Sequence, residues 1–508
     1  MRIGTSDVLS VALDEAMAID RAFTLTVGGE ATLQIGDVVM LSATKMTLRA
    51  VQELRLEVGS SMDDDVREWR YNHEFDNWQD RLGMDSVKVF YHHEHSGMAA
   101  DGRFVAGMGR TWNDTLQADS SRMSFGDQRL RYLLIHGCDS LQMHFGQNPF
   151  RTWAKPKKGA RMIFGFDGLT YDVDGTGAGF FREWNTGKSF SQAWQDAALG
   201  TLTNHRPAST ACGATAEEAQ ERLWNERLFN GGAVSDSWYW WRWAGPIPIE
   251  VQLGIPIPRM PPLNLQLGLR GRDARTAAKL ADRFGVRPLL ARTASPEPDV
   301  YGQDPPSLDG PRLVLLADGS YQAFLAEPDR SAKSVEADSI KAIADRTVRE
   351  MALDVELTFD GLTATHHAGA SRSGHQQKET IGNFSAHYRQ LHNGIPAARG
   401  GDGHLTITLD PSGKVYAIAD RTVRVVEAVE ARPSRGSDHD AEASLTKAEK
   451  ALRRALEDAP CKSHLHVVPD STDVGYRYDR GSAVAVVRRH VEVRTGDYAI
   501  RKILEVIL

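Results

Sequence analysis

The apolar residues between positions 63 and 235 form short runs that alternate with longer helical stretches. Each short run holds four to six mostly β-branched or aromatic residues and is bounded by turn residues, which is typical of buried strands. The predicted strands are Val87–Tyr91, Leu130–Ile135 and Met162–Phe166, and the predicted helices are Ser191–Leu199 and Thr215–Leu228. This alternation predicts an α/β domain over residues 63–235, with a mostly parallel sheet flanked by helices.

The segments on either side of this domain have a different pattern of apolar and turn residues. Residues 1–62 alternate apolar runs with Gly-containing turns, which predicts a β-rich N-terminal segment. Residues 236–272 are rich in Trp and Pro, and Pro cannot donate a hydrogen bond within a central strand. We therefore expect Trp238–Pro262 to be an extended connector or an edge strand, with its rings packed against a neighbouring domain.

The C-terminal half shows a helix followed by strands three times. The predicted helices are Asp273–Phe284, Ser339–Ala352 and Leu445–Leu456. Turn signals such as Asn393-Gly394 separate the strands and indicate antiparallel hairpins. We expect α+β modules over residues 273–430, a polar linker over 431–444, and a last α+β module over 445–508.

Composition narrows the classes of partner. The 508 residues carry a net charge of −7, and no stripe of Lys and Arg accumulates, so neither nucleic acid nor an anionic membrane is an expected partner. The three cysteines show no metal-type spacing and form no disulfide framework. With no signal peptide and no long apolar run, a cytoplasmic location is expected.

Two of the predicted strands lead into residues with nucleophilic or basic side chains. His95 follows Val87–Tyr91, and Cys138 follows Leu130–Ile135. Adjacent parallel strands joined by one crossover would bring both residues to the same edge of the sheet. A Cys is an effective nucleophile only as the thiolate, which a neighbouring His can generate, so the spacing predicts a Cys/His dyad.

The same two segments resemble a known group of enzymes. The run VKVFYHHEHSGMA resembles the strand-then-His-Gly block of the caspase, legumain, gingipain and metacaspase cysteine peptidases, and RYLLIHGCDSLQM resembles their strand-then-Cys block. The stretch from about 63 to 235 resembles more closely an uncharacterised bacterial domain family that shares this arrangement. The resemblance implies a caspase-like fold and peptide-bond cleavage, with a peptide or protein as substrate and no cofactor.

The resemblance also implies a role for each matching residue. His95 would be the general base and Cys138 the nucleophile, and backbone N–H groups near Ser96, Gly97 and Gly137 would stabilise the oxyanion. The sequence departs from the group at two positions. Ser96 stands where Gly usually follows the His, and Gly137 stands where Ala often precedes the Cys.

The C-terminal modules resemble the propeptide domains of thermolysin-type proteases. The similarity lies in the segment IGNFSAHYRQLHNGIPAARGGDGHLTITLDPSGKVYAI. The residues from Leu445 onward resemble the same propeptide domains more distantly. Such modules act as folding aids or inhibitors, so the resemblance implies that they restrain or orient the peptidase domain. They are more usual outside the cytoplasm, which leaves export open.

Two other functions remain alternatives to the peptidase. A caspase-like scaffold that has lost its chemistry would be a binding protein, a reading that Ser96 favours. A zinc-dependent hydrolase would use some of His92, His93, Glu94 and His95, but the His-x-His-x-Asp-His pattern fails because Gly97 and Met98 occupy the last two positions. We therefore expect no metal. Cys212 and Cys461 lack a strand-terminal context and are expected to be structural.

Overall fold

The computed structural model describes a large part of the chain. The described residues are 84–93, 96–107, 117–144, 146–171, 176–201, 205–248, 264–268, 274–286, 299–301, 310–316, 318–429, 441–457, 464–469, 471–479, 481–495 and 498–508, with six strands between Val8 and Ser60. Those six strands are β1 (Val8–Ala12), β2 (Leu25–Val27), β3 (Ala31–Ile35), β4 (Val38–Ser42), β5 (Met46–Leu48) and β6 (Arg55–Ser60). They agree with the β-rich segment expected over residues 1–62.

The described residues between 84 and 248 form an α/β unit. Its elements are the 3₁₀ helix η4 (Met84–Ser86), β7 (Val89–His93), β8 (Ser96–Met98), β9 (Phe104–Gly107), β10 (Gln117–Asp119), β11 (Tyr132–His136), α2 (Pro149–Trp153), β12 (Met162–Phe166), α3 (Thr176–Trp184), α4 (Phe190–Thr201), β13 (Pro207–Gly213), α5 (Ala216–Asn225) and β14 (Trp238–Ile247). The three strands and the two helices predicted in this region are all present, and their ends lie within a few residues of the predicted positions.

The described residues between 264 and 429 form a middle module. Its elements are β15 (Asn264–Gly268), α6 (Ala274–Arg283), β16 (Asp299–Tyr301), β17 (Arg312–Leu315), β18 (Tyr321–Phe324), α7 (Ala337–Met351), β19 (Glu356–Ser371), β20 (Gln376–His392), β21 (Ile395–Pro396), β22 (His404–Leu409), β23 (Val415–Asp420) and β24 (Arg424–Val429). The turn predicted at Asn393-Gly394 joins β20 to β21, with φ of 50° and 76°.

The described residues between 441 and 508 form a C-terminal module. It consists of α8 (Ala441–Glu457), β25 (His464–Val467), β26 (Asp473–Asp479), β27 (Ser482–Thr495) and β28 (Tyr498–Ile507). The order of a helix followed by antiparallel strands is the one expected from residue 445 onward, but α8 begins at Ala441, inside the predicted linker 431–444.

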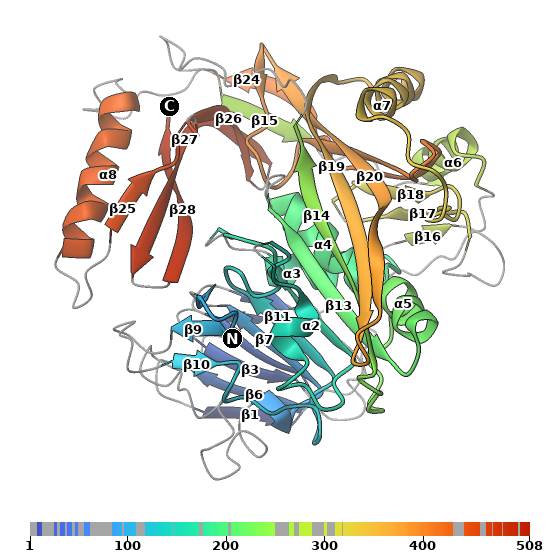
Figure 1. The fold of residues 1–508 in the computed structure, drawn as a ribbon. Coiled ribbons are helices and arrows are strands. Elements are labelled where there is room, and N and C mark those ends of the chain that lie inside the picture. The colour runs from blue at the N-terminus through green and yellow to red at the C-terminus, as the bar shows by residue number, and fades with distance from the viewer. Residues whose placement is uncertain are drawn as a thin grey trace.

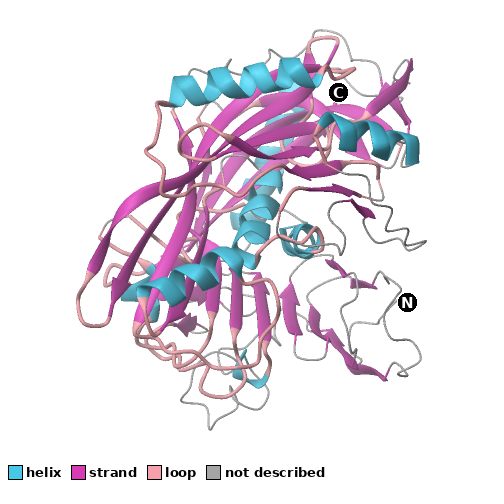
Figure 2. Cartoon of the chain, turned by 90° about the vertical axis from the view of Figure 1, so that its right-hand side faces the viewer, coloured by secondary structure: helices cyan, strands magenta, loops and turns pink. Residues whose placement is uncertain are grey.

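One mixed sheet extends from the N-terminal strands through the α/β unit into the middle module (Figures 1 and 2). Its neighbours follow the order β1, β6, β3, β4, β7, β11, β12, β13, β14, β19, β20, β22, β23, β18, β17 and β16. Pairing is parallel only from β4 through β7 and β11 to β12. The expectation of a mostly parallel sheet therefore holds for this core and is wrong for the rest, which is antiparallel.

Alternation of side chains along β11 explains how the α/β unit is layered. Tyr132 and Leu134 point into the core beneath α3, α4 and α5, whereas Leu133 and Ile135 point into the core shared with α2 and β9. Successive side chains of a strand face opposite sides of a sheet, so this uninterrupted apolar run requires cover on both faces. The result fixes β11 up to His136, two residues before Cys138.

The Trp-rich segment is extended, as predicted, but it is not at an edge. Strand β14 pairs with β13 from Trp238 to Trp243 and with β19 along its whole length. Pro246 lies beyond the end of β13, so its missing N–H is not needed there. The Trp rings of β14 pack into the cores on both faces of the α/β unit.

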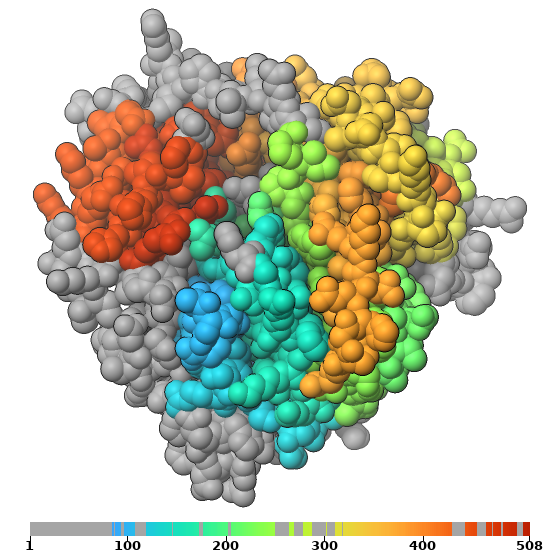
Figure 3. Space-filling model, in the orientation of Figure 1, coloured from blue at the N-terminus to red at the C-terminus, as the bar shows by residue number. Residues whose placement is uncertain are grey.

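The C-terminal module belongs to a second sheet. Strand β28 pairs with β27 and, at Ala499, with Ser96 of β8, while β27 also contacts β15 of the middle module. In Figure 3 the red C-terminal module adjoins the teal residues of the α/β unit on the face shown. Among the described residues no helix is long and apolar enough to cross a membrane.

Candidate functional site at Cys138

The two strands that precede the predicted dyad lie side by side. Strands β7 and β11 are parallel, and their register pairs His93 with His136, the residue two positions before Cys138. The expectation that both segments reach the same edge of the sheet is therefore confirmed at the level of the strands. His95 itself lies outside the described residues, so the distance between its ring and the sulfur of Cys138 stays a prediction.

Cys138 is buried and its thiol is held by the backbone of the next loop. Its side chain is 1% exposed, and the backbone N–H of Thr170 donates to Sγ over 3.3 Å. Burial raises the pKa of the Cys138 thiol to about 12, a shift that the Thr170 hydrogen bond only partly opposes. The sulfur is thus a neutral thiol in this arrangement, and a neutral thiol is a poor nucleophile.

Ser96 is tied directly to the Cys138 loop. The Ser96 hydroxyl donates to the carbonyl oxygen of Cys138 over 2.8 Å, and its side chain is fully buried. The residue that departs from the peptidase pattern therefore holds the two strand ends together. Gly97 follows it in β8 and pairs with Val105.

The turn that begins at Gly137 is fixed by its own hydrogen bonds. The Gly137 carbonyl accepts from the Ser140 hydroxyl over 2.9 Å, and Asp139 adopts a φ of 55° with its N–H donating to the Gly168 carbonyl. A positive φ is uncommon for a residue other than Gly and is often found at functional sites. The predicted oxyanion role of these backbone groups remains a prediction.

His136, the last residue of β11, is a further residue of the site. Its Nε2 lies 3.2 Å from the Tyr171 carbonyl, and its Nδ1 lies 3.4 Å from the Tyr91 hydroxyl. Because a carbonyl can only accept, Nε2 carries a proton. The Thr170 hydroxyl is 3.4 Å from Nε2, so Thr170 contacts both His136 and Cys138.

The C-terminal module covers the loop that holds the thiol. The backbone N–H of Arg501 in β28 donates to the Thr170 carbonyl over 3.2 Å. The Tyr171 hydroxyl is 2.9 Å from Nδ1 of His490 in β27, and burial together with nearby arginines lowers the His490 pKa to about 4. Neutral His490 therefore accepts from Tyr171, and no charge is buried at this contact.

Carboxylates gather at the same edge of the sheet. Asp139 follows Cys138, and Asp167 directly follows β12, where it accepts from His144 over 2.8 Å. Burial and the charge of Asp167 raise the Asp139 pKa to about 6. The sequence analysis missed both residues, although the position of Asp167 immediately after a predicted strand was a usable signal.

Among the remaining histidines and cysteines weighed in the sequence, His92 and Cys212 lie in described parts of the chain, and both are buried. Burial lowers the pKa of His92 to about 3. The described residues include no group of three or more His, Cys, Asp or Glu side chains placed to hold a metal ion. Cys212 is buried in β13, as expected for a structural residue, while Cys461 lies outside the described residues.

Comparison with known proteins extends this description only slightly. No curated protein matches the chain. Residues 59–245 match the model of a protein family described as a domain of unknown function, DUF6345. The matched range contains the whole α/β unit except its last residues, including Ser96, Cys138 and Thr170, and ends within β14.

Proposed function

We propose that the protein is a latent cysteine peptidase with Cys138 as nucleophile and His95 as general base, restrained by its C-terminal module. The observation that carries the proposal is the position of Cys138 directly after β11, at the edge shared with parallel β7, beneath contacts from β27 and β28. A covered, neutral thiol suits an enzyme that is kept inactive until the cover moves.

The proposed chemistry follows from the residue types. His95 takes the proton of the Cys138 thiol, and the thiolate attacks the carbonyl carbon of the scissile peptide bond. The C–N bond then breaks, the leaving amine takes the proton from His95, and a thioester remains on Cys138. Water hydrolyses the thioester, which releases the carboxylic acid and restores the thiol.

The pairing of β28 with β8 supports a role of the C-terminal module in restraint. Ala499 of β28 pairs with Ser96 of β8, so β28 occupies an edge to which an extended peptide could add as a strand. A substrate bound in this way would compete with β28. The proposed substrate is accordingly an extended segment of a peptide or protein.

Two substitutions at Arg501 test the proposal in the full-length protein. Arg501→Pro removes the N–H that donates to the Thr170 carbonyl, whereas Arg501→Ala keeps it and controls for the side chain. This N–H points away from β27, so Pro leaves the β27–β28 pairing in place.

We expect the Pro variant, and not the Ala variant, to cleave members of a random peptide library analysed by mass spectrometry. Adding Cys138→Ala should abolish the cleavage. Cleavage that persists without Cys138 would exclude the dyad, and the absence of cleavage in an opened, folded variant would favour the alternative below.

The alternative is a non-catalytic binding protein built on the same scaffold. The high pKa of the Cys138 thiol and its hydrogen bond from Thr170 favour it, because both suit a buried structural cysteine. This alternative predicts that Cys138→Ala leaves the affinity for a protein partner unchanged and that opening the module creates no peptidase activity.

A further inference from the structure

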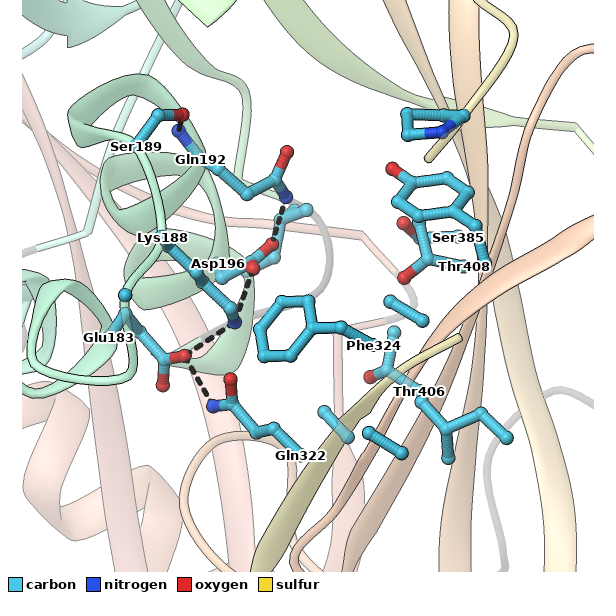
Figure 4. A pocket seen from close by; sticks show the side chains of 18 of the residues that line it. Glu183, Lys188, Ser189, Gln192, Asp196, Gln322, Phe324, Ser385, Thr406 and Thr408 are labelled. Carbon is cyan, nitrogen blue, oxygen red and sulfur yellow. Dashed lines mark hydrogen bonds and ion pairs between the residues drawn. The ribbon is translucent and has the colours of Figure 1, made fainter. Parts of the chain in front are cut away.

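A cavity of about 160 Å³ lies between the α/β unit and the middle module. Helices α3 and α4 supply one wall, and strands β18, β20, β22 and β23 supply the other (Figure 4). An engineered apolar cavity of about 150 Å³ accommodates benzene, so this space suits a molecule of roughly six to ten non-hydrogen atoms. Polar and apolar groups contribute to its lining in similar measure, unlike that of a packing defect.

The carboxylates of the helical wall already have partners. Lys188 donates to Glu183 over 2.7 Å and to Asp196 over 2.6 Å, and Gln322 donates to Glu183 over 2.7 Å, as the dashed lines in Figure 4 show. Arg421 also pairs with Glu183. Burial would raise the Glu183 pKa, but Lys188 and Arg421 outweigh it and hold the pKa below its usual range. Glu183 and Asp196 are therefore already neutralised by side chains of the protein and need no bound cation.

The Arg330 guanidinium, by contrast, forms no ion pair among the described residues, and Glu327, which also lines the cavity, and Glu221 act on its charge only from farther away. The Arg330 guanidinium lines the cavity, lies 4.3 Å from the centre of the Trp224 ring, and has no carboxylate within ion-pair distance among the described residues. Arg242 also stacks on Trp224, at 4.6 Å, and its hydrogen bonds go to neutral Ser191, Gln192 and Gln195. Arg242 does not line the cavity, so the argument for an anionic ligand rests on the Arg330 guanidinium alone.

The strand wall presents hydroxyl groups to the same space. Alternation along β22 sends Leu405, Ile407 and Leu409 into the core under α7 and leaves Thr406 and Thr408 on the cavity face. Thr408 pairs across the sheet with Ser385, and Tyr416 lies on the neighbouring strand.

These groups leave hydrogen-bonding capacity for a polar ligand. Within the described part of the chain, the hydroxyls of Ser385, Thr408 and Tyr416 have no hydrogen-bond partner. The Gln322 Oε1 is buried and likewise lacks a donor there. A ligand that fits must both donate and accept hydrogen bonds.

We infer that this cavity is a binding site for a small hydroxylated carboxylic acid. The carboxylate lies at Arg330, the hydroxyl groups of the acid meet Gln322, Ser385, Thr408 and Tyr416, and the carbon skeleton packs on Phe324. Trp224, Pro328 and Arg330 also line an adjoining open groove, so the carboxylate end of the site borders solvent. The site is separate from Cys138 and does not depend on the peptidase proposal.

Calorimetric titration of the full-length protein tests this site with glycerate, malate and tartrate. We expect at least one acid to bind saturably at one site per chain, and glycerol, which lacks the carboxylate, not to bind. Arg330→Gln should weaken binding by about tenfold or more, since it removes a charge-assisted interaction. Tyr416→Phe should weaken it by roughly threefold or more. Arg346→Gln, an exposed arginine on α7, should leave the affinity unchanged.

Three results would overturn the inference. One is the absence of saturable binding by all three acids, and another is equal affinity of the wild type and Arg330→Gln. The third is equal affinity for sulfate, which would leave an anion site without recognition of hydroxyl groups. Should Arg330→Gln fail to fold, Tyr416→Phe and Ser385→Ala decide, because unchanged affinity in both would contradict the proposed ligand.

Discussion

The α/β unit meets its two neighbours in different ways. Toward the middle module the sheet is continuous, with β14 paired to β19 along its whole length, and buried ion pairs around Glu183 join helix to strand. Toward the C-terminal module, the contacts of described residues that cover Cys138 include one residue pair between β28 and β8, the Arg501–Thr170 backbone hydrogen bond, the Tyr171–His490 pair and the Arg501 guanidinium over the Tyr171 ring. The first interface is extensive and the second is small, and the candidate nucleophile lies under the second, the one that we propose to open.

The largest expected effect comes from breaking the fixed interface at Glu183. Glu183→Gln removes the charge that Lys188 and Arg421 share. Lys188 keeps its ion pair with Asp196, so Arg421 is the buried cation that loses its partner, and such a loss typically costs about 3–5 kcal/mol. We expect the free energy of unfolding, measured in urea, to fall by that order. Glu350→Gln, at an exposed position of α7, is the control and should change it little. Equal stability of the two variants would show that the network does not hold this interface.

A smaller loss of stability is expected at low pH, where His490 contacts the α/β unit. The His490 pKa is about 4 in the folded protein, below its ordinary value of about 6.5, so the unfolded chain takes up this proton first as pH falls. Stability from His490 is present above pH 6.5 and is lost as pH falls toward 4, by roughly 3 kcal/mol.

The His490→Asn variant isolates this contribution. The Asn side-chain oxygen can accept from Tyr171 in place of Nδ1 but does not titrate. Asp85 and Asp139 have pKa values raised to about 7 and 6, so they add stability as the pH falls. Their contribution cancels in the comparison because the wild type and the His490→Asn variant both contain them. We expect the two urea-unfolding profiles to diverge below pH 6.5, with the wild type losing more stability. Parallel profiles would contradict the buried, neutral state of His490.

The smallest expected effect concerns one hydroxyl group. Tyr171→Phe removes the hydrogen bond to His490, which contributes about 1 kcal/mol, and should speed alkylation of Cys138 by iodoacetamide roughly fivefold. Tyr478→Phe is a matched control, since its hydroxyl is buried in the C-terminal module without a hydrogen-bond partner in the described residues. Equal alkylation rates in the two variants would show that this contact does not restrain the cover.

The sequence was sufficient to predict features that depend on local pattern. The apolar runs before His95 and Cys138 predicted β7 and β11 as neighbours, because two buried strands joined by one crossover pair in parallel. The Asn393-Gly394 turn was predictable because Asn and Gly tolerate a positive φ. The central position of β14 was not, since Pro246 limits pairing only where β13 has already ended.

Features that join distant segments left no trace in the sequence. Nothing near Thr170 and Tyr171 indicates that Arg501 and His490 will contact them, because more than three hundred residues separate the partners. The cavity likewise depends on Arg330, Ser385 and Tyr416 facing helices α3 and α4 across two modules. Local propensity carries no information about such contacts, which arise from the packing of whole modules.

The central claim is that Cys138 becomes a nucleophile, activated by His95, once the C-terminal module is displaced. Labelling with a peptidyl acyloxymethyl ketone, mapped by peptide mass spectrometry, tests it most directly. We predict labelling of Cys138 in the Arg501→Pro variant, little in Arg501→Ala, and none when His95→Ala is added to Arg501→Pro. Two results would contradict the account. One is ketone labelling of Cys138 that persists when His95→Ala is added, and the other is a Cys138 that reacts with iodoacetamide in the Arg501→Pro variant but not with the ketone.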